Sequence, residues 1–436
     1  MGQTVTPEAT PRLKSRSVFS GNVAVISLTI AATLTAINMF WPILPLAFRD
    51  LGATDLQVSV AYSLILGTVY LMQLPGGMLA DRFGRRPVMV YSFALAGVCL
   101  VGASFARSWI ALTVSLVAFE AAWAPSLAIV GITVGESVAT ERTGEAVSVM
   151  EILASVGMGV GPAIGALLVG FVPFRTFLLI CGLICLGCSL VRGIWLKETL
   201  KGLRPGGARV SAGTQGGAPR RRGLGAVLRG PVLWLAVVVT CLETGGSLTW
   251  WGPFLPLFAH DGLGLAKPHI DAMFSVGPLV AAALGIVMLR VMDRFGAPRV
   301  TAGGFLAAGI GFSAFFAVGG FGSAVLAMSF IWLAIQLGMA GIETLKVAVT
   351  SPEQRGAVAG AVGAFGGVTA ALVTPVVGKI ATRLGPGIGL WIGAAFFAIG
   401  AAAALALRRS IARSGNEPTS ETGSPGPGLA SSGESG

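Results

Sequence analysis

The chain has 436 residues, of which 54% are hydrophobic and only 11% are charged, and its mean hydropathy is +0.81. A soluble globular protein carries roughly 25% charged residues, so this chain has too little polar surface to coat a water-soluble domain of its size. The net charge of +11 is spread over the ends of many apolar segments instead of forming one patch, which argues against nucleic acid as a partner.

Long apolar segments follow one another along the whole chain. A membrane-spanning helix needs about 20 apolar residues. Because lipid offers the backbone no hydrogen-bond partner, the spanning elements are expected to be helices. The sequence therefore predicts an all-α membrane protein with twelve transmembrane helices, at 22–48, 57–80, 87–106, 109–135, 145–171, 174–196, 231–258, 270–291, 299–319, 322–349, 356–382 and 386–408.

Three polar segments flank and divide these spans. Residues 1–21 are polar and basic, and the apolar run after them is too long for a signal-peptide core, so we expect it to be retained as the first span. Residues 197–230 are rich in Gly, Arg and Pro and are predicted to be a solvated linker. The tail at 409–436 is predicted to be disordered. This leaves two six-helix bundles, at 22–196 and 231–408.

Lysine and arginine are divided unequally between the two ends of the spans. By count, 24 lie at one end, which includes both termini and the central linker, and 6 at the other: Arg49, Arg107, Arg175, Lys267, Lys379 and Arg383. The positive-inside rule assigns the richer end to the cytoplasm. We therefore expect a multi-pass protein of the plasma (inner) membrane with both termini cytoplasmic.

The two bundles repeat one another in sequence. PILPL at 42–46 returns as PFLPL at 253–257, and DRFG at 81–84 returns as DRFG at 293–296. ERTG at 141–144 matches EQRG at 353–356, and Pro162 matches Pro375, so all four offsets lie between 211 and 213. Six spans per bundle give both bundles the same orientation. The pattern predicts parallel repeats related by an axis along the membrane normal.

The loop between spans two and three carries the most specific motif. Residues 77–86 read GMLADRFGRR, which closely resembles the signature loop of the Major Facilitator Superfamily. We expect Gly77 to let two helices approach. The resemblance implies that Asp81 pairs with the start of span eleven when the cytoplasmic side is closed. The alternative is a basic turn that serves topology only. The predicted conformational gate comprises Gly77, Asp81, Arg82, Gly84, Arg85, Arg86 and, from the degenerate second copy, Asp293 and Arg294.

Span five contains a second motif, GMGVGPAIG at 157–165. It resembles, in part, the glycine-rich antiporter motif of bacterial drug:proton exporters in the same superfamily. Its glycines and proline would give a kinkable helix with a flat face, and ordinary small-residue packing is the alternative. The residues that carry this resemblance are Gly157, Gly161, Pro162 and Gly165.

Four carboxylates lie well inside predicted spans, away from their first and last residues, where charge is costly and usually functional. Glu120 and Glu243 lie near mid-span, and Glu151 and Glu343 lie nearer the cytoplasm. The family's arginine in span four is replaced by SLVAFE at 115–120, so an arginine-dependent proton relay is not expected. The alternative for each carboxyl is a hydrogen bond between helices. Since the family's spans one, four, seven and ten line the cavity, the predicted substrate and proton site comprises Asn38, Trp41, Glu120, Trp123, Glu243, Ser247, Trp250, Trp332 and Gln336.

Several functional classes find no support in the sequence. No phosphate loop of the GxxxxGK[ST] type and no GxSxG elbow is present, so we expect neither an ATPase nor a hydrolase. The five cysteines all lie in apolar segments and are expected to be small buried hydrophobes. The prediction is therefore no enzymatic activity, no cofactor and no metal.

The resemblance implies a secondary transporter that works as a monomer in the lipid bilayer. Two acidic groups among aromatic faces suit an amphipathic or cationic cargo. The leading hypothesis is therefore proton-coupled export of such a small molecule. Two alternatives remain open: uptake of a metabolite, and a lipid flippase or membrane scaffold built on the same fold.

Overall fold

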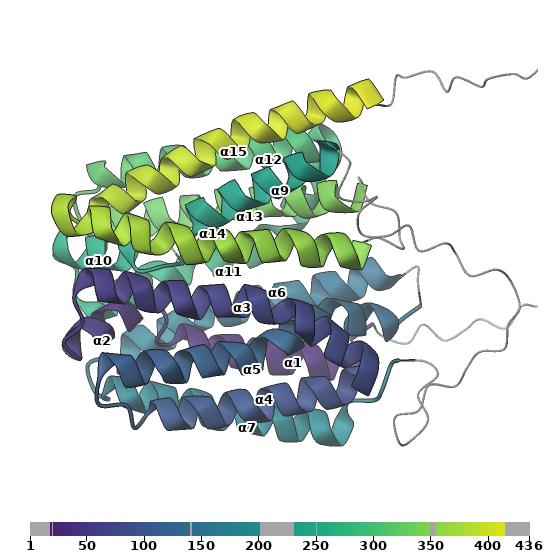
Figure 1. Cartoon of the computed structure of the whole chain (residues 1–436), viewed down its shortest axis with the longest axis horizontal. Coiled ribbons are helices and arrows are strands. Elements are labelled where there is room, and N and C mark those ends of the chain that lie inside the picture. The colour runs from purple at the N-terminus through teal and green to yellow at the C-terminus, as the bar shows by residue number, and fades with distance from the viewer. Residues whose placement is uncertain are drawn as a thin grey trace, which may run out of the picture.

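The computed structural model describes residues 18–19, 21–139, 142–200, 231–249, 251–348 and 355–414. The predicted linker from residue 201 onward, the tail from residue 415 and Trp250 lie outside these ranges. Within them the chain is all-helical. Figure 1 shows the helices lying nearly parallel, with the first half of the chain on one side and the second half on the other.

The first half consists of six long helices and one short one. The long helices are α1 (Asn22–Asn38), α3 (Asp55–Phe83), α4 (Arg85–Ala103), α5 (Trp109–Glu136), α6 (Thr143–Leu168) and α7 (Phe174–Trp195), and α2 (Leu44–Asp50) is short. The second half repeats this order with α9 (Pro231–Ser247), short α10 (Phe254–Asp261), α11 (Lys267–Phe295), α12 (Ala297–Ala314), α13 (Phe321–Ala348), α14 (Arg355–Leu384) and α15 (Gly387–Ser414).

The twelve predicted spans are confirmed as twelve long helices, with two corrections. The first and seventh spans are not continuous, because α1 ends before Pro42 and α9 ends before Pro253, and each continues as the short helix α2 or α10. Proline has no backbone N–H to donate, which weakens a helix at that point, although five other prolines of the chain, such as Pro162, lie inside continuous helices. The last helix also runs to Ser414, six residues beyond the predicted end of span twelve.

The surface of this bundle is suited to lipid. Within the described ranges, nine helices are long and apolar enough to cross a membrane on their own. Large apolar side chains point outward from many of them, among them Val98, Leu183, Leu326 and Leu372. A soluble monomer rarely exposes so much contiguous apolar surface. The protein is therefore a multi-pass membrane protein.

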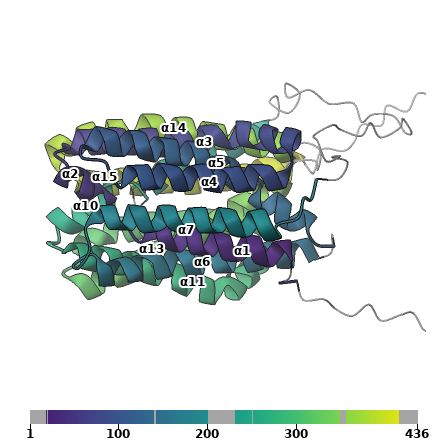
Figure 2. The ribbon, with the colours of Figure 1, turned by 90° about the horizontal axis from the view of Figure 1, so that it is seen from below.

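The two halves meet along two helix pairs, α3 with α14 and α6 with α11. Small residues allow this close approach. Gly67 of α3 lies against Ala371 of α14, and the Ser63 hydroxyl donates to the Ala371 carbonyl (2.6 Å). Figure 2 shows α1, α6 and α11 as neighbours on the other side of the molecule.

The bundle has two distinct ends. The short helices α2 and α10 lie together at one end, which we call the Arg49 end. The turn between α3 and α4 lies at the opposite end, which we call the Asp81 end. Gly84 in this turn has φ 103°, and its repeat mate Gly296 has φ 76°. Residues other than glycine rarely adopt such backbone angles, which explains why both copies of the DRFG motif end in glycine.

Arg192 of α7 is the largest side chain that is fully buried among the described residues. Its Nε donates to the Thr29 hydroxyl (2.9 Å) and its Nη1 to the Ser126 hydroxyl (3.0 Å). The guanidinium carbon lies 3.6 Å from the centre of the Phe93 ring. These contacts join α1, α4, α5 and α7, so this arginine ties the core of the first half together.

Candidate functional site

A cavity of about 190 Å³ lies between the two halves. Its walls come from α3 and α6 of the first half and from α9 and α13 of the second. The lining is largely apolar and aromatic, with one carboxylate among its members: Leu66, Tyr70, Met158, Glu243, Thr244, Ser247, Leu248, Trp251, Trp332, Gln336 and Met339. A pocket of this composition, with a few converging polar groups, is typical of small-molecule sites.

Glu243 is the only carboxylate in this lining among the described residues, and only 7% of the residue is exposed. The Ser247 hydroxyl, one turn along α9, donates to Glu243 Oε1 (2.7 Å), and the Thr244 hydroxyl donates to Oε2 (3.4 Å). Helical spacing places residues i and i+4 on one face, so the predicted pairing of Glu243 with Ser247 is a direct result of the helix. The carboxyl is therefore oriented by its own helix and lines the cavity.

Tyr70 connects this carboxyl to the second predicted one. It lines the cavity from α3 and lies within electrostatic reach of both Glu243 and Glu120. Glu120 itself is 6% exposed on α5 and is absent from the cavity lining. Glu120 is therefore buried in α5, outside the lining of this cavity. Tyr70 has no motif around it in the sequence, so no local signal indicates its position.

The other predicted cavity residues divide into three groups. Trp332 and Gln336 line the cavity as expected. Asn38 and Trp123 do not: the Asn38 amide donates to the Leu34 carbonyl of its own helix (2.8 Å), and the Trp123 ring packs 5.0 Å from Phe93 in the core of the first half. Two further residues cannot be placed, because Trp250 and the side chain of Glu343 lie outside the described part of the chain.

Trp41 lies over the Arg49-end side of the cavity. Its indole Nε1 donates to the carbonyl of Trp251 (3.0 Å), and the two rings are 5.6 Å apart. Trp251 also lines the cavity. The two tryptophans come from opposite halves, so together they separate the cavity from the Arg49 end.

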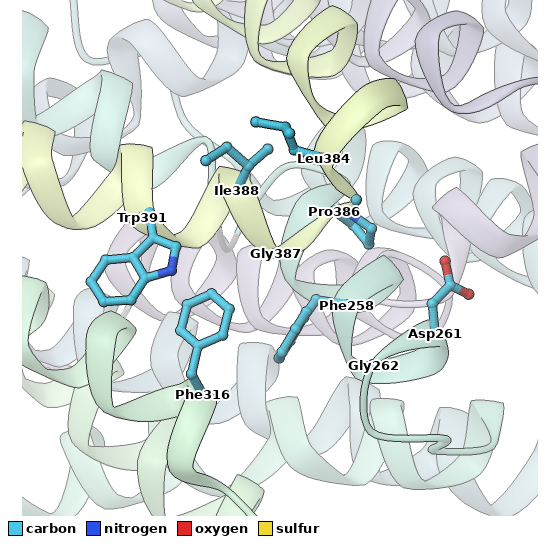
Figure 3. Close-up of a pocket in the computed structure, with 10 residues that line it drawn as sticks. Phe258, Asp261, Gly262, Phe316, Leu384, Pro386, Gly387, Ile388 and Trp391 are labelled. Carbon is cyan, nitrogen blue, oxygen red and sulfur yellow. The ribbon is translucent and has the colours of Figure 1, made fainter.

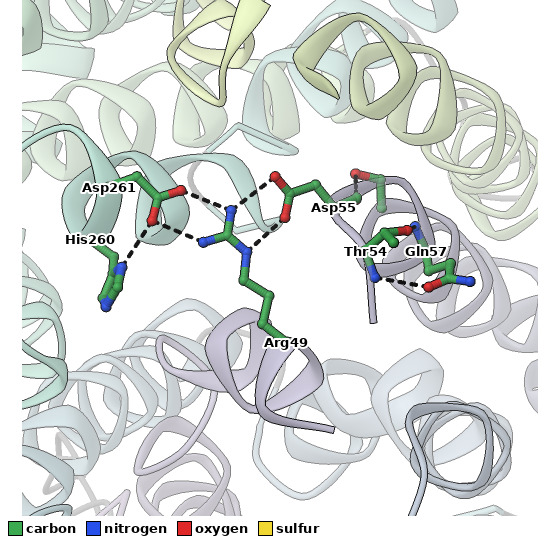
Figure 4. Close-up of polar contacts among 7 residues, drawn as sticks. Arg49, Thr54, Asp55, Gln57, His260 and Asp261 are labelled. Carbon is green, nitrogen blue, oxygen red and sulfur yellow. Dashed lines mark hydrogen bonds and ion pairs between the residues drawn. The ribbon is translucent and has the colours of Figure 1, made fainter. Parts of the chain in front are cut away.

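Beyond the tryptophans, ion pairs hold the halves together (Figure 4). Arg49 of α2 donates two hydrogen bonds to Asp261 of α10, at 2.9 and 2.8 Å, and two more to Asp55, at 2.7 and 2.9 Å. His260 Nδ1 lies 2.9 Å from Asp261 Oδ1. A bidentate guanidinium–carboxylate pair is among the stronger polar contacts in proteins. The Arg49 end is therefore closed in this structure.

The local structure positions this pair precisely where the halves meet, and a second pair supports it. The Thr54 backbone N–H donates to the Gln57 side chain (2.8 Å), a capping arrangement that fixes the start of α3 next to Asp55. Lys267 Nζ lies 2.5 Å from Asp50 Oδ2, again across the halves. Among the residues whose side chains are described, the ion pairs between halves all lie at this end.

The charge environment favours ionised Asp261. Burial tends to raise the pKa of Asp261, but the hydrogen bonds from Arg49 and His260 outweigh burial and hold this pKa below its ordinary value. The carboxylate therefore stays charged at neutral pH, which the pairing with Arg49 requires.

At the Asp81 end, the predicted gate residues contact their own half. Asp81 Oδ1 accepts from Arg85 Nη1 (2.8 Å), and Arg85 Nη2 lies 3.5 Å from Glu136. The carboxylate of Glu198 accepts from the backbone N–H groups of Arg85 and Arg86, at 3.0 and 3.1 Å. The predicted partner of Asp81, at the start of α14, falls where side chains are not described. That pairing stays a prediction.

Three further gate predictions have different outcomes. Gly76 makes the close helix approach that is seen here, since a Cβ on it would meet Pro125 of α5, whereas a Cβ on Gly77 would meet no described residue within 4 Å. Arg82 stacks 5.2 Å from the Phe83 ring, and its repeat mate Arg294 lies 5.4 Å from Phe295. The side chain of Asp293 is not described.

The glycines of the antiporter-like motif face two different neighbours. Cβ atoms on Gly157 and Gly161 would strike the carbonyls of Ala31 and Thr35 on α1. Gly165 lies against both Met39 and Asp271 of α11. Pro162 lies inside α6. The motif thus lets α6 pack closely on α1 of its own half and on α11 of the other.

A separate pocket of about 360 Å³ lies at the Arg49 end of the second half (Figure 3). Phe258, Phe316 and Trp391 form its aromatic walls, and the turn between α14 and α15 closes one side. All its lining residues belong to the second half. It therefore lies apart from the cavity between the halves and is not the candidate site.

Comparison with known proteins is consistent with this architecture. The sequence matches the profile of the Major Facilitator Superfamily over residues 26–372 and, in an overlapping match, over 252–429. It is 26% identical over 292 residues to the probable sulfoacetate transporter SauU of Cupriavidus necator, covering 62% of this chain and 65% of that protein. It is 27% identical over 309 residues to the puromycin resistance protein pur8 of Streptomyces alboniger, covering 66% and 52%. The matched part thus spans about half to two thirds of these relatives.

Among solved structures, the fold is similar to that of a bacterial homologue of the human lysosomal transporter Spinster in an inward-facing, unoccupied conformation. The TM-score is 0.74 at 14% identity, over 92% of this chain and 98% of that one. This likeness concerns the fold alone. Because the family profile matches most of the chain, the protein belongs to the Major Facilitator Superfamily.

Proposed function

We propose that this transporter exports a small amphipathic or cationic molecule in exchange for protons. The observation that carries the proposal is Glu243, a nearly buried carboxyl that lines a cavity shared by both halves. Tyr70, Trp251 and Trp332 surround the same space. Aromatic faces attract cations, and a carboxylate adds a formal charge. Cargo and proton would therefore bind at one place.

Competition between the two ligands is sufficient for exchange. A proton on Glu243 removes the negative charge that holds a cation, and a bound cation prevents protonation. If the halves rock around the cavity, each ligand is released where the other is abundant. The Ser247 hydroxyl can hydrogen-bond the carboxyl in either protonation state, because a hydroxyl both donates and accepts.

Similarity to known transporters supports two kinds of cargo. The relative pur8 is named for puromycin resistance, which is consistent with export. The relative SauU is named as a probable transporter of sulfoacetate, an anionic metabolite. Uptake of such a compound is the second candidate. An anion needs basic groups in its site, and none of the residues that line the cavity is basic. The cavity therefore favours the cationic cargo.

We also propose that the Asp81 end faces the cytoplasm, together with both termini, because lysine and arginine are concentrated there. On this orientation the closed Arg49 end faces the outside. The cavity would then take cargo from the cytoplasmic side, which is the loading step of an exporter.

The test uses purified protein in proteoliposomes with an acidic lumen and a panel of lipophilic cations, with sulfoacetate as the anion. Protons leaving the lumen should drive accumulation of at least one cation. Glu243→Gln keeps the shape and hydrogen bonding of the side chain and removes its titration. It should still exchange cargo down its gradient but should not concentrate it.

The matched control is Glu145→Gln, which removes a carboxylate from an exposed pair with Arg142 at the Asp81 end. Its pH-driven accumulation should equal that of the wild type. Unchanged accumulation in Glu243→Gln would refute the role of this carboxyl. Accumulation of sulfoacetate but of no cation would favour the second candidate.

A further inference from the structure

Asp271 is a fully buried acidic residue that the cavity does not use. It lies in the second turn of α11 with none of its surface exposed, and neither carboxylate oxygen has a hydrogen-bond partner among the described residues. In the sequence it is only the second residue of the predicted span 270–291 and belongs to no motif. Its surroundings indicate what it does.

Asp271 lies at the contact between the two halves. Its Oδ2 is 3.1 Å from the point where a Cβ on Gly165 of α6 would stand. The carbonyl of Met39, just after the end of α1, borders the same glycine. The side chain is therefore enclosed by α11 on one side and by the ends of α1 and α6 on the other.

Few charged groups can act on this carboxyl. Helix α1 carries none. Those of α6, Glu145 and Glu151, lie about 20 Å or more from Gly165 along the helix, at 1.5 Å per residue. On α11 the near groups are Lys267, which is paired with Asp50, and His269, whose ring lies 4.9 Å from that of Phe321. The other charges of α11 and those of α13 lie at the Asp81 end, while α2 and α10 contribute Arg49, Asp50, His260 and Asp261.

This position makes protonation depend on conformation. An ionised carboxylate buried without a partner is far more costly than the neutral acid. While α6 and α11 are in contact, Asp271 is therefore in its protonated, neutral form. Lys267, one turn earlier, belongs to the closure at the Arg49 end. Opening that end parts the helices around Asp271 and lets water reach the carboxyl, which can then ionise.

We propose that Asp271 is a proton-binding site, separate from Glu243, whose occupation by a proton is required for the two halves to close at the Arg49 end. The proposal rests on the proposed function to the extent that protons drive the transport cycle. It adds the step that links proton binding to the conformational change. Glu243 would decide whether cargo or proton occupies the cavity, and Asp271 would decide whether the Arg49 end can close.

The linkage has a definite sign. Because the closed state holds a proton that the open state releases, a higher pH should favour the open state. A single linked proton changes the ratio of closed to open protein by up to about tenfold per pH unit. Asp271→Asn is neutral at every pH and has nearly the same shape, so it should stay closed across the range.

The experiment measures closure directly, without cargo. Spin labels at Arg107 and Gly319, exposed positions in opposite halves at the Arg49 end, report the distance between the halves in nanodiscs from pH 5 to pH 9. The background has its five cysteines replaced. The wild type should shift to longer distances as the pH rises, and Asp271→Asn should not. A His260→Gln/His269→Gln background removes both histidines of the chain, which lie near this end and titrate in the range.

Glu243→Gln separates the two proposals. It should keep the pH-dependent distance change while losing pH-driven accumulation. A wild type whose distances do not respond to pH, or an Asp271→Asn variant that responds as the wild type does, would overturn the role of Asp271. Loss of the response in Glu243→Gln and its persistence in Asp271→Asn would place the linked proton on Glu243 and overturn it as well. Asp271→Leu, also uncharged, shows whether any effect depends on the amide of Asn.

Discussion

The pair between Arg49 and Asp261 should set the balance between the closed and open states of the Arg49 end. Asp261→Asn keeps the size of the side chain and removes its charge. The bidentate contact, at 2.8 and 2.9 Å, then becomes at best one neutral hydrogen bond. The side chains are 25% and 34% exposed, so solvent screens part of the attraction, as it does for surface pairs worth 0 to about 1 kcal/mol.

Bidentate geometry raises the value of the pair above that of a simple surface contact. We therefore expect a loss of about 1–2 kcal/mol from the closed state, which corresponds to roughly a 5- to 30-fold change in the ratio of closed to open protein. At a fixed pH, the distribution of distances between spin labels at positions 107 and 319 should shift visibly toward the longer distances of the open state. The charge-exchanged double variant Arg49→Asp/Asp261→Arg should recover part of the closed population.

The control is again Glu145→Gln, which breaks a more exposed ion pair within one half. It should leave the distances unchanged. The reasoning fails if Asp261→Asn gives the distance distribution of the wild type, because the pair would then contribute nothing to closure.

The pair also predicts a pH response, and its sign is opposite to that of Asp271. The pKa of Asp261 is lowered in the closed state, since hydrogen bonds from Arg49 and His260 outweigh the effect of burial. A group whose pKa is lowered in the closed state stabilises that state fully when the pH is above the group's ordinary pKa, which is about 4 for Asp. This stabilisation is lost as the pH falls through the lowered pKa. Opening caused by loss of this pair should therefore appear only in acid, and Asp261→Asn should abolish it.

Three further outcomes are expected. Arg192→Ala should lower the thermal stability of the detergent-solubilised protein by about 2–4 kcal/mol, because it leaves a cavity beside Phe93; an unchanged melting temperature would contradict its core role. Gly161→Val should reduce folded yield, because its side chain would strike the Thr35 carbonyl, whereas Gly77→Val, with open space around it, should not. Cysteines at 216 and 420 should resist an impermeant reagent on intact cells, and strong labelling of either from outside would reverse the proposed orientation.

The overall architecture could be predicted from the sequence because a bilayer restricts what a chain can do. Apolar runs of sufficient length must become helices, and the repeat between the halves supplied their arrangement. The break before Pro42 was not expected, because hydropathy averages over a break of a few apolar residues. The motif at 77–86 pointed to Gly77 instead of Gly76, since the contact of Gly76 with Pro125 depends on how α3 crosses α5.

The candidate site was only partly predictable, for the same reason. Helical spacing placed Glu243 and Ser247 on one face, and the structure confirms that they contact. Trp123 was wrongly expected to line the cavity, because the face of a helix that meets the cavity depends on its rotation, which spacing does not fix. Asp271 and the pair of Arg49 with Asp261 were missed because their environments consist of residues from the other half of the chain.

The position of this pair has a consequence for how the two halves could have diverged. The motifs PILPL and PFLPL, which precede this pair by a few residues, are 211 residues apart, so Arg49 is equivalent to His260 and Asp50 to Asp261. The pair therefore joins positions that are one place apart across the axis between the repeats, and so do the rings of Trp41 and Trp251, which are tilted by 31°. In a newly duplicated chain with Arg49 and Asp50 in both copies, each arginine could have faced the aspartate of the other copy. The charged contact could therefore have formed while the halves were still identical, and His260 now stands at the place of the second arginine.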